Sequence, residues 1–509
     1  MADTLHYKAS HDVEKSQTSD RDLDRVTTVQ VGQQHSHDIK KDFGPFTIIA
    51  LGFNICNSWV AIATSFAIVV AAGGTVTLVY GVIIASLVYA TVAASLAELA
   101  SVYPTAGGQY HFTALVAPKA ITRVASYACG VISIFSWIAL CAAATILGSQ
   151  ILLALPVYYD DTYVPKNWHY FLVYQAINVT LLIYNMFALK RTLWLHSRLP
   201  PSLTVVACLA LSAKQPSSYV WENFENSTGW SDGVTFLTGL VTPCFMFAGL
   251  DASLHLAEEC TEPSKTVPRA LMVTVVIGSI TGFTFSIAMC YSIVDLDAML
   301  NTTMPIYILW RQATGSPAAA TTFLIALFII ILFVVNAMQQ TASHLIWAFG
   351  RDDAIIFSKQ LSRMHPTLEV PVWGLIGNAG CVLIAGCIYL ASTAAFNALV
   401  NSSIVLQMLS FSIPCMMLLL RKRSADVLPE QRSFKLPGWL GWLCNLVVVV
   451  FAVIEIVFFN LPTALPVSAI SMNYTCAVIG IMAVLAVINW YLHTRKHYKG
   501  PNIRLEETQ

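Results

Sequence analysis

Charged residues are scarce in this chain, and their scarcity excludes most soluble folds. Of its 509 residues, 11% are charged and 56% are hydrophobic, and the mean hydropathy is +0.65. A soluble domain carries roughly 25% charged residues, more than twice this share. The 28 basic residues balance the 28 acidic ones, so no net positive charge favours a nucleic acid partner, and we expect none.

Cysteine motifs and catalytic signatures are also lacking. The cysteines are scattered singly, without a CxxC pair or a His/Cys group of metal-ligand spacing. We interpret them as small core residues, neither disulfides nor metal ligands. No paired-carboxylate, nucleophile-base or phosphate-loop signature occurs outside the apolar runs, and the loops are too short to form a catalytic domain. The sequence therefore predicts neither an enzyme nor a bound metal or cofactor.

Long apolar runs are what the chain contains instead. About 17 to 25 apolar residues suffice to cross a hydrocarbon core of about 30 Å. Twelve candidate spans lie near 45–69, 76–99, 124–155, 169–189, 193–213, 234–257, 270–293, 318–348, 371–392, 396–420, 438–460 and 468–491. We predict an all-α polytopic membrane protein, with a disordered cytoplasmic N-terminal tail (1–42), a twelve-helix domain (43–492) and a cytoplasmic C-terminal tail (493–509).

The distribution of basic residues supports this topology. Lys and Arg concentrate in the cytoplasmic loops of membrane proteins. With both termini cytoplasmic, the inside segments hold 25 of the 28 basic residues, and Lys166, Lys214 and Arg311 fall outside. The acceptor sequences at Asn226 and Asn301 then lie in outside loops, where we predict glycosylation.

Two predicted spans are interrupted by polar residues or glycine. The first interruption is Leu51-Gly-Phe-Asn-Ile-Cys-Asn-Ser-Trp59, and the second is Phe247-Ala-Gly-Leu-Asp251. A broken helix exposes unpaired backbone groups that can hold a polar solute near the bilayer midplane. Paired breaks in two separate spans therefore indicate a solute transporter.

Several motifs resemble those of the amino acid-polyamine-organocation transporters, and most of all the fungal permeases for choline, 4-aminobutyrate and amino acids. The resemblance lies in residues 52–59, 95–111, 251–259, 267–270 and 434–439, and its most specific part is Tyr103-Pro-Thr-Ala-Gly-Gly-Gln109. It implies that spans 1 to 5 and 6 to 10 form an inverted-repeat core with broken helices 1 and 6. Two further helices, spans 11 and 12, are then peripheral.

The two breaks supply the candidate substrate-binding residues. At the first, amide and hydroxyl groups reach mid-span, and a freed helix N-terminus favours a carboxylate. At the second, glycine admits close backbone approach, and aromatic faces suit a substituted ammonium. The candidates are Asn54, Cys56, Asn57, Ser58, Trp59, Phe245, Phe247, Ala248 and Gly249. Alternatively, the small polar residues of the first break only mediate helix packing.

Ionisable residues within the spans are candidates for proton coupling or gating: Glu98, Asp251, His255, Glu258 and His344. Asp251, His255 and Glu258 are spaced to share one helix face, although Asp251 is alternatively an N-cap. In the resembling family, the loop after Glu98 helps form the inner gate and span 8, which holds His344, lines the pathway. Glu455 lies in span 11, where we expect a protonated, hydrogen-bonded side chain or a subunit contact.

We therefore expect a plasma-membrane secondary transporter that imports an amino acid, 4-aminobutyrate or choline. The resemblance implies coupling to protons. The alternatives are an exporter or organellar carrier of a secondary metabolite, and a nutrient sensor that does not transport. The fifth span is short and interrupted by Pro200 and Pro201, which alters substrate choice, impairs transport or reflects a faulty gene model. Substrate, direction, stoichiometry and oligomeric state stay open at this stage.

Overall fold

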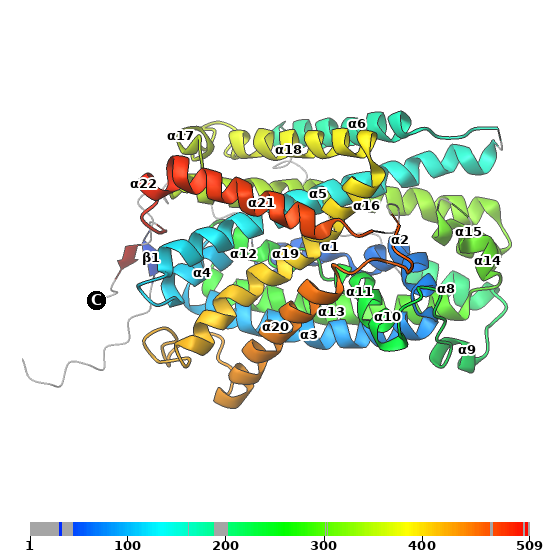
Figure 1. The fold of residues 1–509 in the computed structure, drawn as a ribbon, viewed down its shortest axis with the longest axis horizontal. Helices are drawn as coiled ribbons and strands as arrows, with labels where there is room; N and C mark the ends of the chain where they lie inside the picture. The colour runs from blue at the N-terminus through cyan, green and yellow to red at the C-terminus, as the bar shows by residue number, and fades with distance from the viewer. Residues whose placement is uncertain are drawn as a thin grey trace, which may run out of the picture.

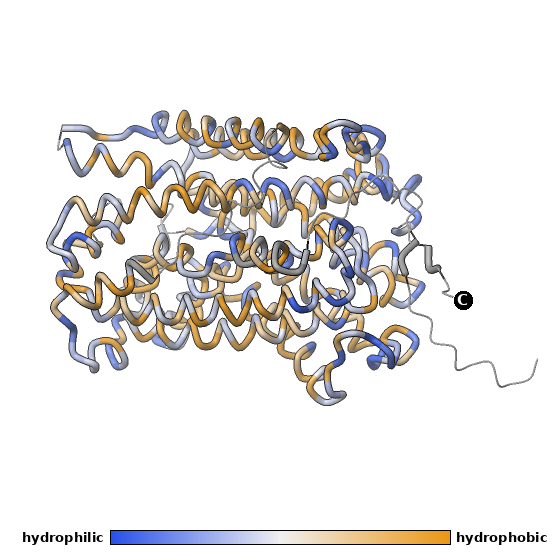
Figure 2. Tube along the Cα trace, turned by 180° about the vertical axis from the view of Figure 1, so that it is seen from behind, coloured by the Kyte–Doolittle hydropathy of each residue, from blue (hydrophilic) through white to orange (hydrophobic). Residues whose placement is uncertain are grey.

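The computed structural model describes residues 30–32, 44–160, 162–187, 202–300, 302, 304–468, 472–501 and 504–506. Long helices run side by side along the length of the molecule (Figure 1). Hydrophobic residues dominate these helices, and hydrophilic residues gather towards the two ends of the bundle (Figure 2). Because lipid offers no hydrogen bonds, a helix is the element that satisfies the backbone within each span.

Ten helical segments in the described part of the chain are long and apolar enough to cross a membrane. They are α1 with α2 (Pro45–Cys56 and Ser58–Ala71), α3 (Gly74–Val102), α5 (Thr122–Tyr159), α6 (Asn167–Phe187), α13 (Pro263–Tyr291), α16 (Pro317–Arg351), α18 (Val372–Ala391), α19 (Thr393–Leu420), α20 (Gly438–Phe458), and α21 (Thr475–Asn489) continued by η4 (Trp490–Thr494) and α22 (Arg495–His497). The all-α polytopic fold is thereby confirmed, and the count of twelve spans stays a prediction.

The two remaining predicted spans, the fifth and the sixth, are not single long helices. Within the fifth, the structure describes α8 (Ser202–Leu211), while the prolines at its start lie outside the described residues. The sixth consists of α10 (Asp232–Gly239), α11 (Val241–Phe245), a turn, α12 (Ala252–His255) and the 3-10 helix η3 (Ala257–Glu259).

The shorter elements cap the two ends of the bundle (Figure 1). One end, called here the terminal end, carries α4 (Gln109–Val116), α17 (Ser358–Leu361) and α22, together with an antiparallel pair of β1 (Gln30–Gly32) and β2 (Arg504–Glu506). The other, called the far end, carries α9 (Ser217–Trp221), α14 (Leu296–Leu300) and α15 (Pro305–Thr314).

Both predicted helix breaks are confirmed. Asn57 separates α1 from α2 with a left-handed backbone (φ 31°), a conformation that Asn adopts more readily than most residues. Gly249 lies in the turn after α11 with φ 83°, where only glycine is free of strain. Helix α13 passes beside both breaks, because a Cβ at Gly278 would come within 2.6 Å of Ser58 Oγ and 3.4 Å of Phe247 Cε1.

Candidate functional site

The two helix breaks bind each other directly. Ser58 Oγ donates a hydrogen bond of 2.8 Å to the carbonyl oxygen of Met246, and Cys56 Sγ lies 3.9 Å from the carbonyl oxygen of Phe247. Helix α11 ends at Phe245, so these two carbonyls lie in the turn that follows it, where helix-end carbonyls lack intrahelical partners. Side chains of the first break thus satisfy the backbone of the second.

Polar atoms without partners also lie in the first break. Asn54 Nδ2 and Asn57 Oδ1 are buried and have no hydrogen-bond partner among the described residues. Buried polar groups are nearly always paired, so one donor and one acceptor are available here to a polar ligand. Trp59 is buried and packs on Phe285, with ring centroids 5.5 Å apart.

A cavity of about 720 Å³, called here the vestibule, leads from the far end towards these breaks. Its walls come from α2, α5, α10, α11 and α19 and from the loops after α9 and α20. No charged side chain is among the described residues that line it; its polar groups are neutral amides and hydroxyls. Its volume lies within the range of small-molecule sites, roughly 300–1,000 Å³.

Phe245 is the one predicted substrate-binding residue that lines the vestibule. Phe247 is fully buried and stacks on Tyr89, with ring centroids 4.9 Å apart. Ala248 is buried, and the N–H of Gly249 donates to Gln407 Oε1 at 3.1 Å. Phe245 therefore faces the vestibule, and the other predicted residues lie in the junction of the breaks and do not line it.

Asp251 is the centre of a buried hydrogen-bond network. Its Oδ2 accepts from Gln109 Nε2 at 2.6 Å and Trp137 Nε1 at 3.1 Å and lies 3.0 Å from His255 Nε2, and its Oδ1 accepts from Gln407 Nε2 at 3.2 Å. Asp251 stands at the N-cap position of α12, but its side chain makes no cap hydrogen bond. The prediction that this side chain satisfies the first amides of the helix is therefore wrong, and the carboxylate instead joins α4, α5 and α19 to the second break.

His255 faces an acceptor with each ring nitrogen. Nδ1 lies 3.0 Å from the carbonyl oxygen of Ala106, and Nε2 lies 3.0 Å from Asp251 Oδ2. A neutral imidazole carries a single N–H and cannot donate to both. An additional proton shared by Asp251 and His255 would let both contacts be hydrogen bonds. His344 has a similar arrangement, between the carbonyl oxygen of Gln340 (2.9 Å) and Glu259 Oε1 (2.6 Å).

Glu258 belongs to a separate ion pair, so the prediction that it shares a helix face with Asp251 and His255 is wrong. Helix α12 ends at His255, and Glu258 lies on the 3-10 helix that follows, so the spacing of a regular helix does not apply to it. Its carboxylate accepts two hydrogen bonds from Arg351, of 3.0 and 3.1 Å, and one of 3.2 Å from the amide of Ala106. This pair connects the second break to the end of α16.

The carboxylate of Glu258 is almost completely buried, so the Arg351 guanidinium and the Ala106 amide replace the water that it lacks. Next to it, Asp352 Oδ2 lies 2.9 Å from both Tyr110 Oη and His111 Nε2. Charged contacts thus close the terminal end of the path between the breaks and α16.

Glu98 lies at the same end and is fully buried. It pairs with Arg432 at 2.6 Å and with Arg423, and it accepts from the amide of Leu436 at 3.2 Å. These partners follow α19 in the chain, so Glu98 binds the loop between α19 and α20 to α3.

Several residues of this network escaped the sequence-based predictions, namely Gln109, Trp137, Glu259, Arg351, Asp352 and Gln407. Gln109 ends the motif that carries the resemblance, and Gln407 is a polar residue within an apolar run, so each offered a local signal.

Glu455 is fully buried inside the bundle beside the Cys244 thiol, which excludes the predicted alternative of a subunit contact.

The predicted glycosylation sites have different outcomes. Asn226 Nδ2, the atom that would carry a glycan, donates to the carbonyl oxygen of Trp230 at 2.7 Å and to Asp232 Oδ1 at 2.9 Å. Its modification stays a prediction. Asn301 lies outside the described residues.

Comparisons with known proteins agree with this arrangement. Residues 43–484 match the family model described as amino acid permease. The chain is 32% identical over 486 residues to the choline transporter of Saccharomyces cerevisiae, covering 92% of this chain and 84% of that protein. It is 29% identical over 472 residues to the swainsonine transporter of Arthroderma benhamiae, covering 90% and 92% respectively.

A solved structure shares the fold. The crystal structure of the manganese transporter of Eremococcus coleocola superposes with a TM-score of 0.52 at 15% sequence identity, covering 92% of this chain and 99% of that one. Identity this low supports a common architecture and carries no information on substrate.

Proposed function

Because the chain belongs to the amino acid permease family, we propose that it is a proton-coupled secondary transporter that imports a small amino-bearing solute across the plasma membrane. Family membership makes it a multi-pass membrane transporter and not an enzyme. To this general role the proposal adds the amino-bearing class of solute, the proton as coupling ion, import as the direction of transport and the plasma membrane as the location. It also places both termini in the cytoplasm, as the distribution of basic residues favours.

The relation between the vestibule and the two breaks carries this proposal. The vestibule opens from the far end, is lined by α2, α5, α11 and α19, and stops at Phe245 beside the second break. On the other side of the breaks, the Glu258–Arg351 and Glu259–His344 pairs close the terminal end. A site open on one side and closed on the other is what alternating access requires. The opposite state forms when these pairs separate.

The chemistry of the vestibule supports an amino-bearing solute. Phe245, Phe396, Phe458 and Phe459 line it, and aromatic faces attract ammonium groups without a charged partner. Beyond the vestibule, in the first break, the unpaired polar atoms of Asn54 and Asn57 suit a hydroxyl, carboxylate or amine of a solute that has moved past Phe245. Choline, 4-aminobutyrate and amino acids all combine these features, and one relative is named a choline transporter.

Proton coupling is assigned to the Asp251–His255 pair, because an additional proton there would let both contacts of the imidazole be hydrogen bonds. The pair also touches the second break and spans 3 and 10, so its protonation state can influence whether the breaks separate. The Glu258–Arg351 and Glu98–Arg432 pairs are assigned to gating, because each joins elements far apart in the chain at the terminal end.

Uptake in a yeast strain lacking its own transporters tests this function. We would follow labelled choline, 4-aminobutyrate and an amino acid panel at acid and neutral external pH, with an empty vector and a Phe245→Ala variant as controls. Acid-stimulated accumulation of one solute, reduced in the variant, is the expected result. Accumulation that ignores pH would reject proton coupling. Efflux from preloaded cells without uptake would reject import in favour of export.

A further inference from the structure

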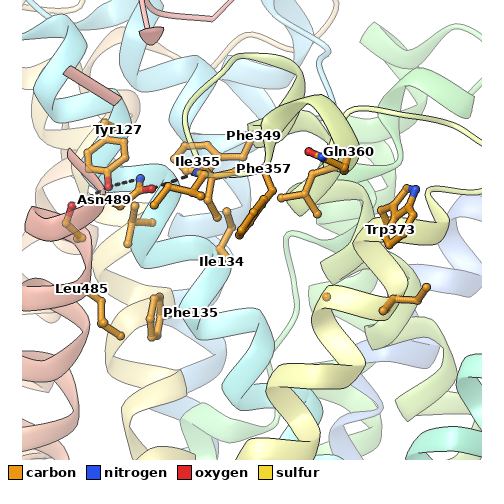
Figure 3. Close-up of a pocket in the computed structure, with 16 residues that line it drawn as sticks. Tyr127, Ile134, Phe135, Phe349, Ile355, Phe357, Gln360, Trp373, Leu485 and Asn489 are labelled. Carbon is orange, nitrogen blue, oxygen red and sulfur yellow. Dashed lines mark hydrogen bonds between the residues drawn. The ribbon is translucent and has the colours of Figure 1, made fainter. Parts of the chain in front are cut away.

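A second cavity, called here the flank cleft, lies away from the vestibule and the breaks. Its volume is about 760 Å³, and it opens between α5, α18 and α21, beneath the loop that leads from α16 into α17 (Figure 3). Its walls are almost entirely apolar, with Ile134 and Phe135 of α5 opposite Leu485 of α21 and Ile376 of α18. This volume is also within the range of roughly 300–1,000 Å³ for ligand sites.

Two polar side chains on the wall of the flank cleft, Asn489 and Tyr127, already have partners. Asn489 Nδ2 donates to Tyr127 Oη at 2.9 Å and to the carbonyl oxygen of Ala354 at 3.0 Å, and its Oδ1 accepts from the amide of Ile356 at 3.1 Å. Tyr127 Oη in turn donates to the carbonyl oxygen of Ala486 at 2.8 Å. Because these two groups are satisfied and Gln360 is exposed, the cleft suits an apolar ligand and offers little to a polar solute.

The mouth of the flank cleft is both apolar and strained. Phe357 is 71% exposed and has a left-handed backbone with φ 66°, a conformation that costs an aromatic residue energy and persists where the surroundings impose it. Its ring extends from the loop into the cleft (Figure 3). Trp373 and Leu485 are exposed at the rim as well, as expected of side chains that face lipid.

Basic side chains border the mouth at the terminal end. Lys359 and Arg363 are exposed on α17 and just after it, and Arg495 and Lys496 are exposed on α22. His493 Nε2 lies 3.4 Å from Ser358 Oγ, which brings these two segments together. Among the described residues of this border, one acidic side chain, Asp353, is exposed. The border is therefore positive on balance, and it lies where phospholipid headgroups meet a polytopic protein.

We propose that the flank cleft binds one acyl chain of an anionic phospholipid, with the headgroup held among Lys359, Arg363, Arg495 and Lys496. The bound chain would fill the space between α18 and α21 and pack against Phe349. Phe349 also contacts Tyr110, with ring centroids 5.3 Å apart, and Tyr110 bonds to Asp352. Lipid occupancy therefore braces the closed terminal end, independently of which solute is transported.

Two glycines of α18 give a matched test. A Cβ at Gly377, which lines the cleft, would lie 3.9 Å from Leu361 Cδ2, an ordinary contact, and a Cβ at Gly380 would meet nothing within 4 Å. Gly377→Leu therefore fills the cleft without a clash, and Gly380→Leu adds the same side chain to the same helix outside it. Native mass spectrometry of the purified full chain, titrated with phosphatidylserine or phosphatidylcholine, measures bound lipid.

We expect wild type and Gly380→Leu to retain one phosphatidylserine. Gly377→Leu should bind this lipid about tenfold more weakly, which corresponds to the loss of about two buried methylene groups of the acyl chain. Equal retention by the two glycine variants would overturn the proposal. A dimer mass that Gly377→Leu reduces to the monomer would assign the cleft to a second copy of the chain and would also overturn it.

A charge test keeps the proposal open to refutation even if Gly377→Leu misfolds. Lys359→Gln and Lys496→Gln together should weaken phosphatidylserine binding by about fivefold per residue and leave phosphatidylcholine binding unchanged. Lys265→Gln, which removes an exposed charge at the start of α13, should change neither. An equal effect on both lipids, or none on phosphatidylserine, would show that the basic border does not hold a headgroup.

Discussion

Replacing Asp251 with Asn should disrupt the network that holds the second break, because the carboxylate serves four side chains at once. Gln109, Trp137 and His255 meet Oδ2, and Gln407 meets Oδ1. An Asn side chain has one oxygen, and its amide nitrogen would face a donor. Turning the amide of Gln407 does not resolve this conflict, since its Oε1 already accepts from the amide of Gly249 at 3.1 Å.

The expected loss of folding stability can be worked out from these contacts. Loss of a hydrogen bond to a charged group costs about 1.5–3 kcal/mol, and a buried donor left without an acceptor costs about 1–3 kcal/mol. Some relaxation is expected, so Asp251→Asn should lower stability by about 2–4 kcal/mol. The substitution also removes the negative charge that favours an additional proton on the Asp251–His255 pair, so acid stimulation of uptake should disappear along with it.

Thermal unfolding of the purified protein and uptake at acid and neutral pH measure these two effects. Asp426→Asn is the control, because Asp426 is exposed in the loop between α19 and α20 and should behave as wild type. If Asp251→Asn unfolds at the wild-type temperature and keeps acid-stimulated uptake, the network is neither structural nor proton-binding. Lower stability with unchanged pH dependence would retain the network and reject the coupling role.

Two further predictions concern the closed end and the second break. Arg351→Ala leaves Glu258 buried without its partner and should cost about 3 kcal/mol in thermal unfolding, most of which the double Glu258→Ala/Arg351→Ala variant should recover. Equal stability of the single and double variants would contradict the pairing. Gly249 has φ 83°, and a Cβ there would lie 2.6 Å from Ile55 Cγ2. Gly249→Ala should therefore lower the free energy of unfolding by at least about 1–2 kcal/mol and reduce uptake. Gly380→Ala, the control, should change neither stability nor uptake.

The breaks could be predicted from the sequence because their signal is local. Asn57 and Gly249 each interrupt an apolar run within a few residues, and no distant information is needed to see that a helix cannot continue normally there. The same holds for Glu98, since any carboxylate within a predicted span requires a partner. What the local pattern could not supply was the identity of that partner.

The partners lie too far along the chain for pattern or periodicity to predict. Asp251 is separated by 142 residues from Gln109 and by 156 from Gln407, and Glu98 by 334 residues from Arg432. The error about Glu258 has another cause. Its spacing from Asp251 fits a regular helix, but α12 ends at His255 and a 3-10 helix follows, and no residue between them marks that change.

The network around Asp251 would link the proposed proton site to the movement that alternating access requires. Gln407 donates to Asp251 and accepts from the amide of Gly249, so one side chain of α19 holds the carboxylate and the backbone of the break together. When a second proton neutralises Asp251, the hydrogen bond from Gln407 loses its charged acceptor and weakens by about half. The restraint on Gly249 weakens with it. Protonation on the vestibule side would thus loosen the break, while the Glu258–Arg351 pair, whose carboxylate stays ionised at neutral pH, keeps the terminal end closed until the solute is bound.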